Sequence, residues 1–209
     1  MNYIHDPKAI EARSFEIITE ILGSKSFTQQ EERIIKRVIH TTADFEYADL
    51  MEISPDAIEA AFNEIRKGSN IVTDTNMAYS GINKKVLGSF GSEAHCFIAN
   101  EEVARVAKEQ GITRAMASMD VAVQNPKNMI FAIGNAPTAL FRLKELIEEG
   151  KARPALIIGV PVGFVNVVES KEAIKTLNIP YIICNGRKGG STVAAAIVNA
   201  LLYMIGDRE

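Results

Sequence analysis

The chain has 209 residues, 47% of them hydrophobic and 23% charged, and a formal net charge of -3 at pH 7. This length is sufficient to bury a sizeable core, and we expect one domain over residues 1–209. The small negative charge excludes a general attraction to nucleic acid or to an anionic membrane, so any basic site must be local. The first residues carry charges where a signal peptide needs an apolar core, and no apolar run has the length of a membrane span. We therefore expect a cytoplasmic protein.

The two cysteines, Cys96 and Cys184, lie far apart in the sequence. They form neither a C-x-x-C pair nor the ligand spacing of a zinc site. The sequence therefore predicts reduced thiols and no structural metal.

Proline and glycine mark two helices in the first third of the chain. Asp6 precedes a first-turn Pro7, apolar residues then recur at helical spacing, and Gly23 ends the run. A second segment starts at Ser54-Pro55 and closes at Gly68 with the same asymmetry. We expect an N-terminal helical segment.

Between them, Thr28 and Glu31 have the spacing of a capping box, which predicts a helix that ends near His40. A protonated histidine in the last turn is stabilised by the helix dipole. Three basic residues occupy the same turns, so a capping cluster is one interpretation of this histidine: Arg33, Lys36 and Arg37. Proton transfer is the other interpretation, because histidine is the side chain suited to titration near neutral pH.

From residue 70 onward, short apolar runs alternate with segments of helical periodicity. Such runs are typical of buried parallel strands, and the alternation predicts a doubly wound α/β fold whose mostly parallel sheet is flanked by helices. We expect strands over residues 70–75, 129–134, 155–160 and 181–186, and helices over residues 100–111, 136–150, 167–178 and 189–205.

Glycine-rich segments follow three of these strands, at residues 134–138, 159–164 and 185–192. In an open α/β sheet, ligands bind beyond the carboxyl ends of the strands, and a helix N-terminus behind a glycine loop offers free N–H groups to an anion. Neither G-x-G-x-x-G nor G-x-x-x-x-G-K-[ST] occurs in the chain, which disfavours nucleotides. The residues alone predict an anionic ligand, and they do not distinguish a carboxylate from a phosphate.

Other chemistry-bearing residues have ordinary interpretations. We expect an exposed His5, and a His95 buried in a strand beside Cys96 rather than a catalytic thiol pair. Asp74 and Asp120 follow apolar segments, and we expect them to cap helices, with a role in substrate binding as the alternative.

Six ordered segments together resemble the precorrin-8 methylmutases of corrin biosynthesis, over essentially the whole chain. They are EARSFEII at 11–18, KRVIHTTADFEY at 36–47, GITRAMASMD at 111–120, GNAPTALFRL at 134–143, GVPVGFVNVVESKEA at 159–173 and GRKGGSTVAAAIVNAL at 186–201. The stretch IHTTADFEY is more similar to the cobalt-containing branch of the family than to the metal-free branch.

The resemblance implies an isomerase that moves a methyl group from C-11 to C-12 of precorrin-8 or cobalt-precorrin-8. The reaction needs no cofactor, any cobalt belongs to the substrate, and the product is cobyrinate or hydrogenobyrinate. A homodimer with the macrocycle near the subunit interface is also implied, and the apolar C-terminal helix is consistent with it.

The resemblance assigns the catalytic proton transfer to His40. The cations available for the carboxylates of a corrinoid are Arg13, Arg37, Lys84, Lys85, Arg114, Arg187 and Lys188, and we expect the two lysines at 84 and 85 to be surface residues. The predicted substrate-binding set is Ser14, Arg37, Thr41, Arg114, Asn135, Gly163, Arg187, Gly189 and Ser191. Thr41, Thr42 and Asp44 are the candidates for orienting the histidine.

Two alternatives stay open at this point. A non-catalytic corrinoid carrier would need the same broad cleft, and a nicotinamide-dependent oxidoreductase would use the same type of sheet without its usual glycine fingerprint.

Overall fold

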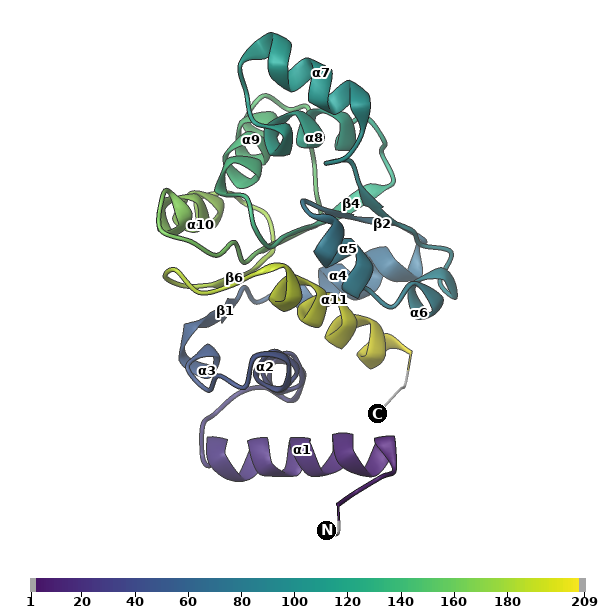
Figure 1. Ribbon diagram of the computed structural model, residues 1–209, viewed down its shortest axis with the longest axis vertical. Coiled ribbons are helices and arrows are strands. Elements are labelled where there is room, and N and C mark those ends of the chain that lie inside the picture. The colour runs from purple at the N-terminus through teal and green to yellow at the C-terminus, as the bar shows by residue number, and fades with distance from the viewer. Residues whose placement is uncertain (1–2, 207–209) are drawn as a thin grey trace.

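The computed structural model describes residues 3–206, and its α/β architecture confirms the predicted fold class. A six-stranded sheet lies in the middle of the molecule, with helices on both faces and two N-terminal helices at one end (Figure 1). The helices are α1 (Pro7–Leu22), α2 (Gln29–Thr42), α3 (Tyr47–Leu50), α4 (Ala57–Arg66), α5 (Asn76–Gly81), α6 (Lys84–Gly88), α7 (Glu101–Gln110), α8 (Arg114–Ala122), α9 (Pro137–Glu148), α10 (Val167–Lys175) and α11 (Ser191–Ile205).

The sheet has the strand order β1-β6-β5-β4-β2-β3. Its strands are β1 (Met51–Ile53), β2 (Asn70–Thr73), β3 (Ala94–Cys96), β4 (Asn128–Ile133), β5 (Leu156–Gly159) and β6 (Tyr181–Cys184). The last five strands are parallel and doubly wound, whereas β1 pairs antiparallel with β6 at one edge. The order reverses between β2 and β4, and this is the position at which doubly wound sheets bind their ligands.

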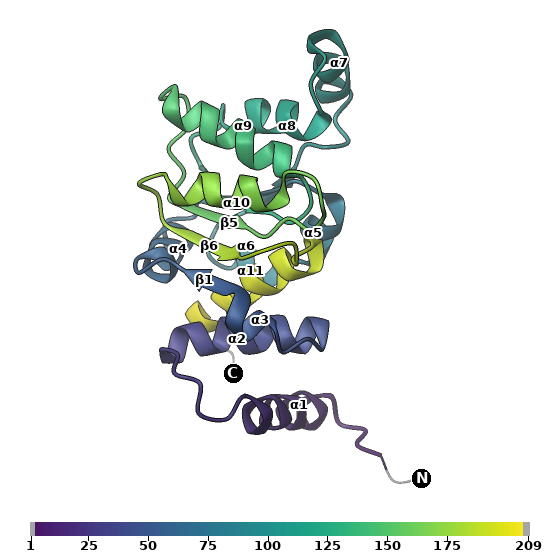
Figure 2. The same ribbon diagram turned by 90° about the vertical axis from the view of Figure 1, so that its left-hand side faces the viewer.

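Two apolar clusters cover the two faces of the sheet. Helices α4, α5, α6 and α11 pack on one face, and α8, α9 and α10 pack on the other (Figure 2). Strands β4 and β5 are buried over nearly all of their residues, because neither face reaches solvent, and their sequences are accordingly continuous apolar runs. Helix α11 is central to the first cluster, since it contacts the sheet, α5 and α2.

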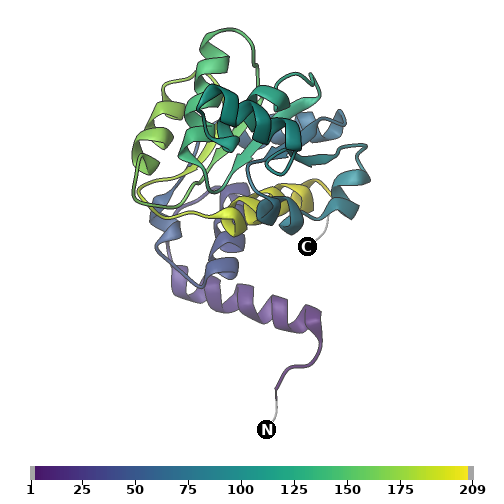
Figure 3. The ribbon, with the colours of Figure 1, turned by 45° about the horizontal axis from the view of Figure 1, so that its top comes forward.

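The N-terminal helices form an additional layer outside α11. Helix α2 packs on α11, and α1 packs on α2 (Figure 3). The predicted capping box is present: Thr28 Oγ1 accepts from the Glu31 amide at 3.2 Å and the Glu31 carboxylate accepts from the Thr28 amide at 2.8 Å. Asp6 caps α1 by accepting from the Ala9 amide at 2.8 Å.

The sequence prediction missed several short elements. Edge strand β1 and helices α3, α5 and α6 are only three to six residues long, too short to give a periodic signal. Helix α8 was recognised only as part of a family motif. The helix predicted to begin at Ser54-Pro55 begins instead at Ala57. Ser54 forms hydrogen bonds with the backbone of Tyr181 next to the sheet, so it is not part of the helix.

The described residues include no helix that is long and apolar enough to span a membrane.

Candidate active site

His40 lies in the last turn of α2, exposed to solvent, with its ring stacked on Phe15 of α1 at 5.2 Å between centroids. The helix end itself is capped by backbone, since the Ala43 amide donates to the Ile39 carbonyl at 2.7 Å. Ala43 has the positive φ of 53° that this type of cap requires. The imidazole is therefore not needed to cap the helix, and it lies against the Phe15 ring of α1.

Arg37 lies one turn before His40, as the helical spacing predicts. Its guanidinium carbon is 4.8 Å from the Phe15 ring centroid and 5.1 Å from that of Tyr203, and its Nη1 pairs with Glu11 at 2.7 Å. Two aromatic rings and one carboxylate thus hold the guanidinium in place, on the same side of α2 as the histidine.

A hollow of about 270 Å³ brings α2 together with α5 and α11. Its lining residues are Arg37, His40, Thr41, Met77, Gly81, Thr192, Ala195, Ala196, Asn199 and Tyr203. Most of these side chains are small or apolar, and the cation and the imidazole lie on one wall. The close packing of α5 on α11 explains Gly81, because a Cβ there would come within 2.8 Å of the Ala195 Cβ.

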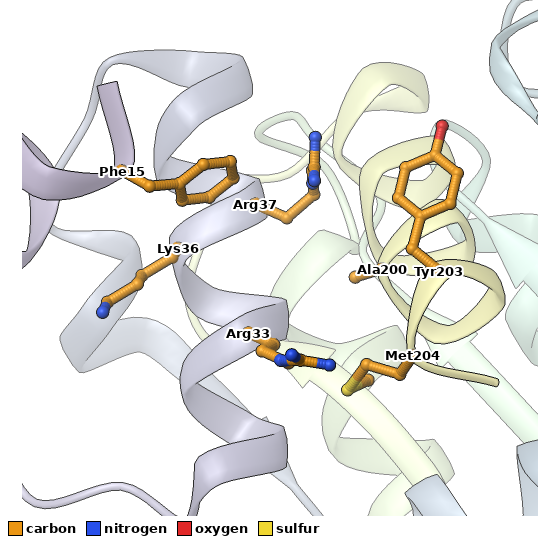
Figure 4. Close-up of a pocket in the computed structure, with 7 residues that line it drawn as sticks. All are labelled: Phe15, Arg33, Lys36, Arg37, Ala200, Tyr203 and Met204. Carbon is orange, nitrogen blue, oxygen red and sulfur yellow. The ribbon is translucent and has the colours of Figure 1, made fainter. Parts of the chain in front are cut away.

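Two further hollows adjoin the first. One, of about 320 Å³, lies between α1 and the end of α2 and is lined by Ser14, Ile17, Ile18, Ile21, Ile39, His40, Ala43 and Phe45. The other, of about 280 Å³, is shown in Figure 4 and is lined by Phe15, Arg33, Lys36, Arg37, Ala200, Tyr203 and Met204. His40 is shared by the first two hollows and Arg37 by the first and third, so these side chains lie within one extended groove.

The segment after α2 ties this groove to the glycine loop that precedes α11. Lys188 donates to Asp44, and its ammonium also pairs with Glu46 at 2.7 Å. The Lys188 hydrogen bond lowers the pKa of Asp44, and the two carboxylates raise the pKa of the lysine. Lys188 is therefore already neutralised within the chain, and Asp44 faces Lys188 instead of orienting the His40 ring.

The three glycine loops meet at the carboxyl edge of the sheet, as predicted. A Cβ on Gly134 would lie 2.7 Å from the Ser191 Cα, and a Cβ on Gly189 would lie 2.1 Å from the Val160 carbonyl oxygen. The Ser191 hydroxyl is 2.8 Å from that of Thr75, which caps α5. Glycine is needed at positions 134 and 189 because backbone packs against backbone there.

Asp74 occupies the point at which the strand order reverses. Its buried carboxylate accepts from the amides of Gly134, Asn135 and Ala136 at 2.9, 2.8 and 2.7 Å. Burial raises the pKa of Asp74 although these three bonds oppose the shift. The amides that would hold a nucleotide phosphate in a doubly wound fold are thus filled by an anion of the chain itself, an argument against the oxidoreductase alternative.

Comparisons with known proteins show the family of this chain. The model of the precorrin-8X methylmutase family matches residues 9–204. The chain belongs to this family. It is 50% identical to cobalt-precorrin-8 methylmutase of Salmonella typhimurium, with 97% of this chain and 98% of that one covered, and 35% identical to precorrin-8X methylmutase of a Sinorhizobium species, with 96% of each covered. A crystal structure of precorrin-8X methylmutase from Thermus thermophilus superimposes with a TM-score of 0.88 at 42% identity, over 96% of this chain and 97% of that one.

As a member of the methylmutase family, the chain is an isomerase of corrin biosynthesis that moves a methyl group within one molecule. The relatives named above are all methylmutases. The carrier alternative therefore gains no support.

The structure brings together some residues that sequence analysis assigned to the methylmutase site. His40, Arg37, Thr41 and Ser14 line the adjoining hollows. The Ser14 hydroxyl donates to the Ile10 carbonyl at 2.8 Å, so its oxygen keeps lone pairs for a ligand.

The remaining predicted residues lie outside these hollows. Asn135, Gly163, Arg187, Gly189 and Ser191 belong to the three loops of the carboxyl edge. Arg114 begins α8, on the other face of the sheet, where neighbouring Thr113 and Thr138 join α8 to the start of α9 with hydroxyls 3.0 Å apart. Both arginines are exposed, and neither forms an ion pair within residues 3–206. Their roles stay predictions.

Sequence reasoning missed Phe15, Tyr203 and Met77 as lining residues. Each appeared only as one apolar residue among others, and only the packing of α1, α5 and α11 around α2 reveals them. The aromatic residue within the matched segment EARSFEII was the one available signal.

Two expectations for single residues need correction. Asp120 does not cap a helix: it lies within α8 and pairs with Arg142 at 2.7 Å. His95 is in a strand, but at the edge of the sheet, and its side chain is 28% exposed instead of buried. For Asp74 the expected cap is present, because its carboxylate accepts from the amide of Ala136, the residue that precedes α9.

Other expectations for single residues are confirmed. His5 is exposed, as are Lys84 and Lys85.

Arg13, one of the cations considered for the substrate carboxylates, is exposed and pairs with Glu16 and Glu20. Within residues 3–206, no group of three or more His, Cys, Asp or Glu side chains is arranged to hold a metal ion.

Proposed function

We propose that this chain converts cobalt-precorrin-8 into cobyrinate by moving the C-11 methyl group to C-12, with the cobalt carried by the substrate. Relatives named cobalt-precorrin-8 methylmutase share 39% to 50% identity with the chain, whereas those named precorrin-8X methylmutase share 35% and 36%. The higher identities support the cobalt-containing substrate over the metal-free one.

The observation that carries the proposal is the groove around His40. A corrinoid is a broad apolar ring edged with carboxylates, and it calls for apolar walls with a few cations around them. The adjoining hollows offer such walls from α1, α5 and α11, with Arg37 beside the imidazole.

In the proposed mechanism, His40 donates a proton or a strong hydrogen bond to the ring C region of the macrocycle. This interaction withdraws electron density, the bond from C-11 to the methyl group breaks as the bond to C-12 forms, and the proton then returns to the imidazole. The shift is internal to the substrate and balanced, so we propose that no cofactor takes part. Arg37 is held between two rings and gives only Nη1 to Glu11, so its remaining N–H groups bind a substrate carboxylate at a fixed place relative to the histidine.

The test is the His40→Asn variant, assayed by following the absorption spectrum of cobalt-precorrin-8 without any added cofactor. Loss of general acid–base help is expected to slow turnover by about 10²–10⁴-fold, while cobyrinate still binds. His40 is exposed in the last helical turn, so unfolding free energy should fall by only about 1 kcal/mol. The control is His95→Asn, which removes the histidine of β3 and should leave turnover unchanged. Turnover of the His40 variant within a few-fold of wild type would disprove the catalytic role.

We also propose that two copies of the chain form a homodimer through α1. Ile10, Ile17 and Ile21 lie on one side of that helix and are 46%, 40% and 59% exposed, an unusual amount of aliphatic surface for an isolated helix. The hollow that contains Ile17, Ile21 and His40 is open, and a second copy on α1 would close it. A macrocycle larger than any one hollow would then lie near the interface.

Light scattering tests the assembly. Wild type should have twice the chain mass at micromolar concentration, whereas Ile17→Glu should shift it toward the monomer because burial of a charge opposes association. Thr19→Glu places the same charge on another side of α1 and should stay dimeric. A monomeric wild type would refute the proposed dimer.

A further inference from the structure

The loop between β6 and α11 is held by its backbone carbonyls. Lys171 of α10 donates through Nζ to the carbonyls of Gly186 and Lys188, at 2.8 Å each. Between these two, the Arg187 carbonyl accepts from the Gly163 amide at 3.2 Å. Three consecutive carbonyls are thus fixed by α10 and by the loop that leads into it.

Lys171 is an unusual residue for this position. It is 1% exposed, and a lysine is almost never fully buried without a partner of opposite charge. The charged groups on neighbouring elements are engaged with one another: Lys188 with Asp44 and Glu46, and Lys175 with Glu52 and Glu172. Among residues 3–206, the titratable group that acts on it is the thiol of Cys184 on β6, and burial raises the pKa of that thiol to about 11. Carbonyl dipoles therefore replace a carboxylate as the partners of the ammonium.

This arrangement determines which cation the loop offers to a ligand. Lys188 turns toward Asp44 and Glu46 and is neutralised. Arg187, between the two carbonyls that Lys171 holds, is exposed and has no carboxylate partner in the described part of the chain. A guanidinium can bind a carboxylate with two parallel hydrogen bonds, but only when its backbone is fixed in a suitable place.

We propose that Lys171 is a positioning residue: its buried ammonium fixes the backbone of residues 186–188 so that Arg187 is presented to a carboxylate of the substrate. The inference rests on the proposed corrinoid-binding function. It adds to that function a residue that never touches the ligand and a dependence on pH.

The pH dependence follows from the burial. Desolvation lowers the pKa of Lys171 from 10.5 to about 8. Above that pH the group is a neutral amine, and its hydrogen bonds to the two carbonyls lose their charge assistance. A change in product affinity that is absent from the Lys171→Met variant therefore reports on the lysine.

The experiment measures the dissociation constant of cobyrinate by absorption or calorimetric titration, from about pH 7 to about pH 9.5, across the range in which the group loses its proton. In wild type the dissociation constant should rise roughly tenfold with pH, because charge-assisted hydrogen bonds are about twice as strong as neutral ones. The Lys171→Met variant should bind roughly tenfold more weakly than wild type already at neutral pH and show no further change with pH. Its turnover number at saturating substrate should change far less than its KM.

Lys144→Met is the matched control. Lys144 is a part-buried lysine of α9, paired with Glu148 on its own helix, and its loss should leave both the affinity and its pH profile as in wild type. Circular dichroism confirms that each variant is folded at each pH.

Two outcomes would overturn the inference: a flat pH profile in wild type, or a Lys171→Met variant that is less stable but keeps the affinity and the pH profile of wild type. If Lys171→Met does not fold, the pH profile of wild type still tests the proposal, since a flat profile contradicts it. Failure of wild type to bind cobyrinate or to convert cobalt-precorrin-8 would instead refute the proposed function itself.

Discussion

Two glycines of the same loop should respond very differently to an added methyl group. Gly189 has a φ of +153°, and a Cβ there would lie 2.1 Å from the Val160 carbonyl oxygen and 2.7 Å from that of Pro161. Gly186 also has a positive φ, of +72°, but a Cβ there would have no atom within 4 Å. Alanine at position 186 therefore measures the cost of backbone strain alone, and alanine at position 189 measures backbone strain together with a steric clash.

The expected magnitudes follow from these contacts. Gly186→Ala should cost about 1 kcal/mol of unfolding free energy, the penalty for a side chain in the left-handed region. Gly189→Ala adds the clash, at about 1–3 kcal/mol, to a similar or larger strain. It must also separate the backbone pair from the Gly190 amide to the Val160 carbonyl, now 2.8 Å long, at about 1 kcal/mol. The total of roughly 3–6 kcal/mol is a large share of the 5–15 kcal/mol that stabilises a typical domain.

Urea unfolding at 25 °C measures both values, and cobyrinate titration of the folded variants shows whether the loop still binds. Gly189→Ala should be strongly destabilised and bind product poorly. Gly186→Ala should bind product well. If the two variants differ by less than about 1 kcal/mol, the loops separate easily and the explanation for Gly189 is wrong.

Three further substitutions test charges at this end of the sheet. Burial opposes the ionisation of Glu52, but hydrogen bonds from Lys175, Tyr181 and Asn185 outweigh it and lower its pKa from 4.5 to about 2. This carboxylate therefore contributes stability above pH 4.5 that is lost as the pH falls toward 2. Because its side chain is 37% exposed, Glu52→Gln should remove only about 1–2 kcal/mol of unfolding free energy at neutral pH. The unfolding free energy of the variant should also depend less on pH in this acid range. Asp74→Ala should cost about 3 kcal/mol or more in urea unfolding, because it leaves three amides without their acceptor, and a loss under 1 kcal/mol would contradict that reading. Arg187→Ala should weaken cobyrinate binding by about 1.5–3 kcal/mol and reduce its salt dependence, whereas Arg153→Ala, before β5 at the opposite edge, should change neither in calorimetric titrations.

The sequence by itself determined the class of fold and most of its long elements. Continuous apolar runs such as residues 155–160 can be satisfied only between two helical layers, and the capping box at Thr28 specifies a helix start through bonds within four residues. Family motifs also fixed the choice of His40 and Arg37, whose nearness follows from one turn of helix. These features depend on residues close together in the sequence, so they can be predicted without knowledge of the tertiary packing.

Tertiary structure alone decided the surroundings of those residues. Stacking of Phe15 on His40, and Tyr203 on the far side of Arg37, depends on how α1 and α11 pack against α2. Strand β1 joins the sheet antiparallel, although nothing in its three residues specifies a partner.

The same is true of the partners of two buried charged residues. Asp74 caps a helix that begins more than sixty residues later, and Lys171 holds a loop from the helix before it. The partners of both are backbone amides and carbonyls. Because nearly all residue types carry these groups, the sequence does not indicate which of them will be the partners. Their selection depends on the order of the strands, because that order decides which loops meet at the edge of the sheet.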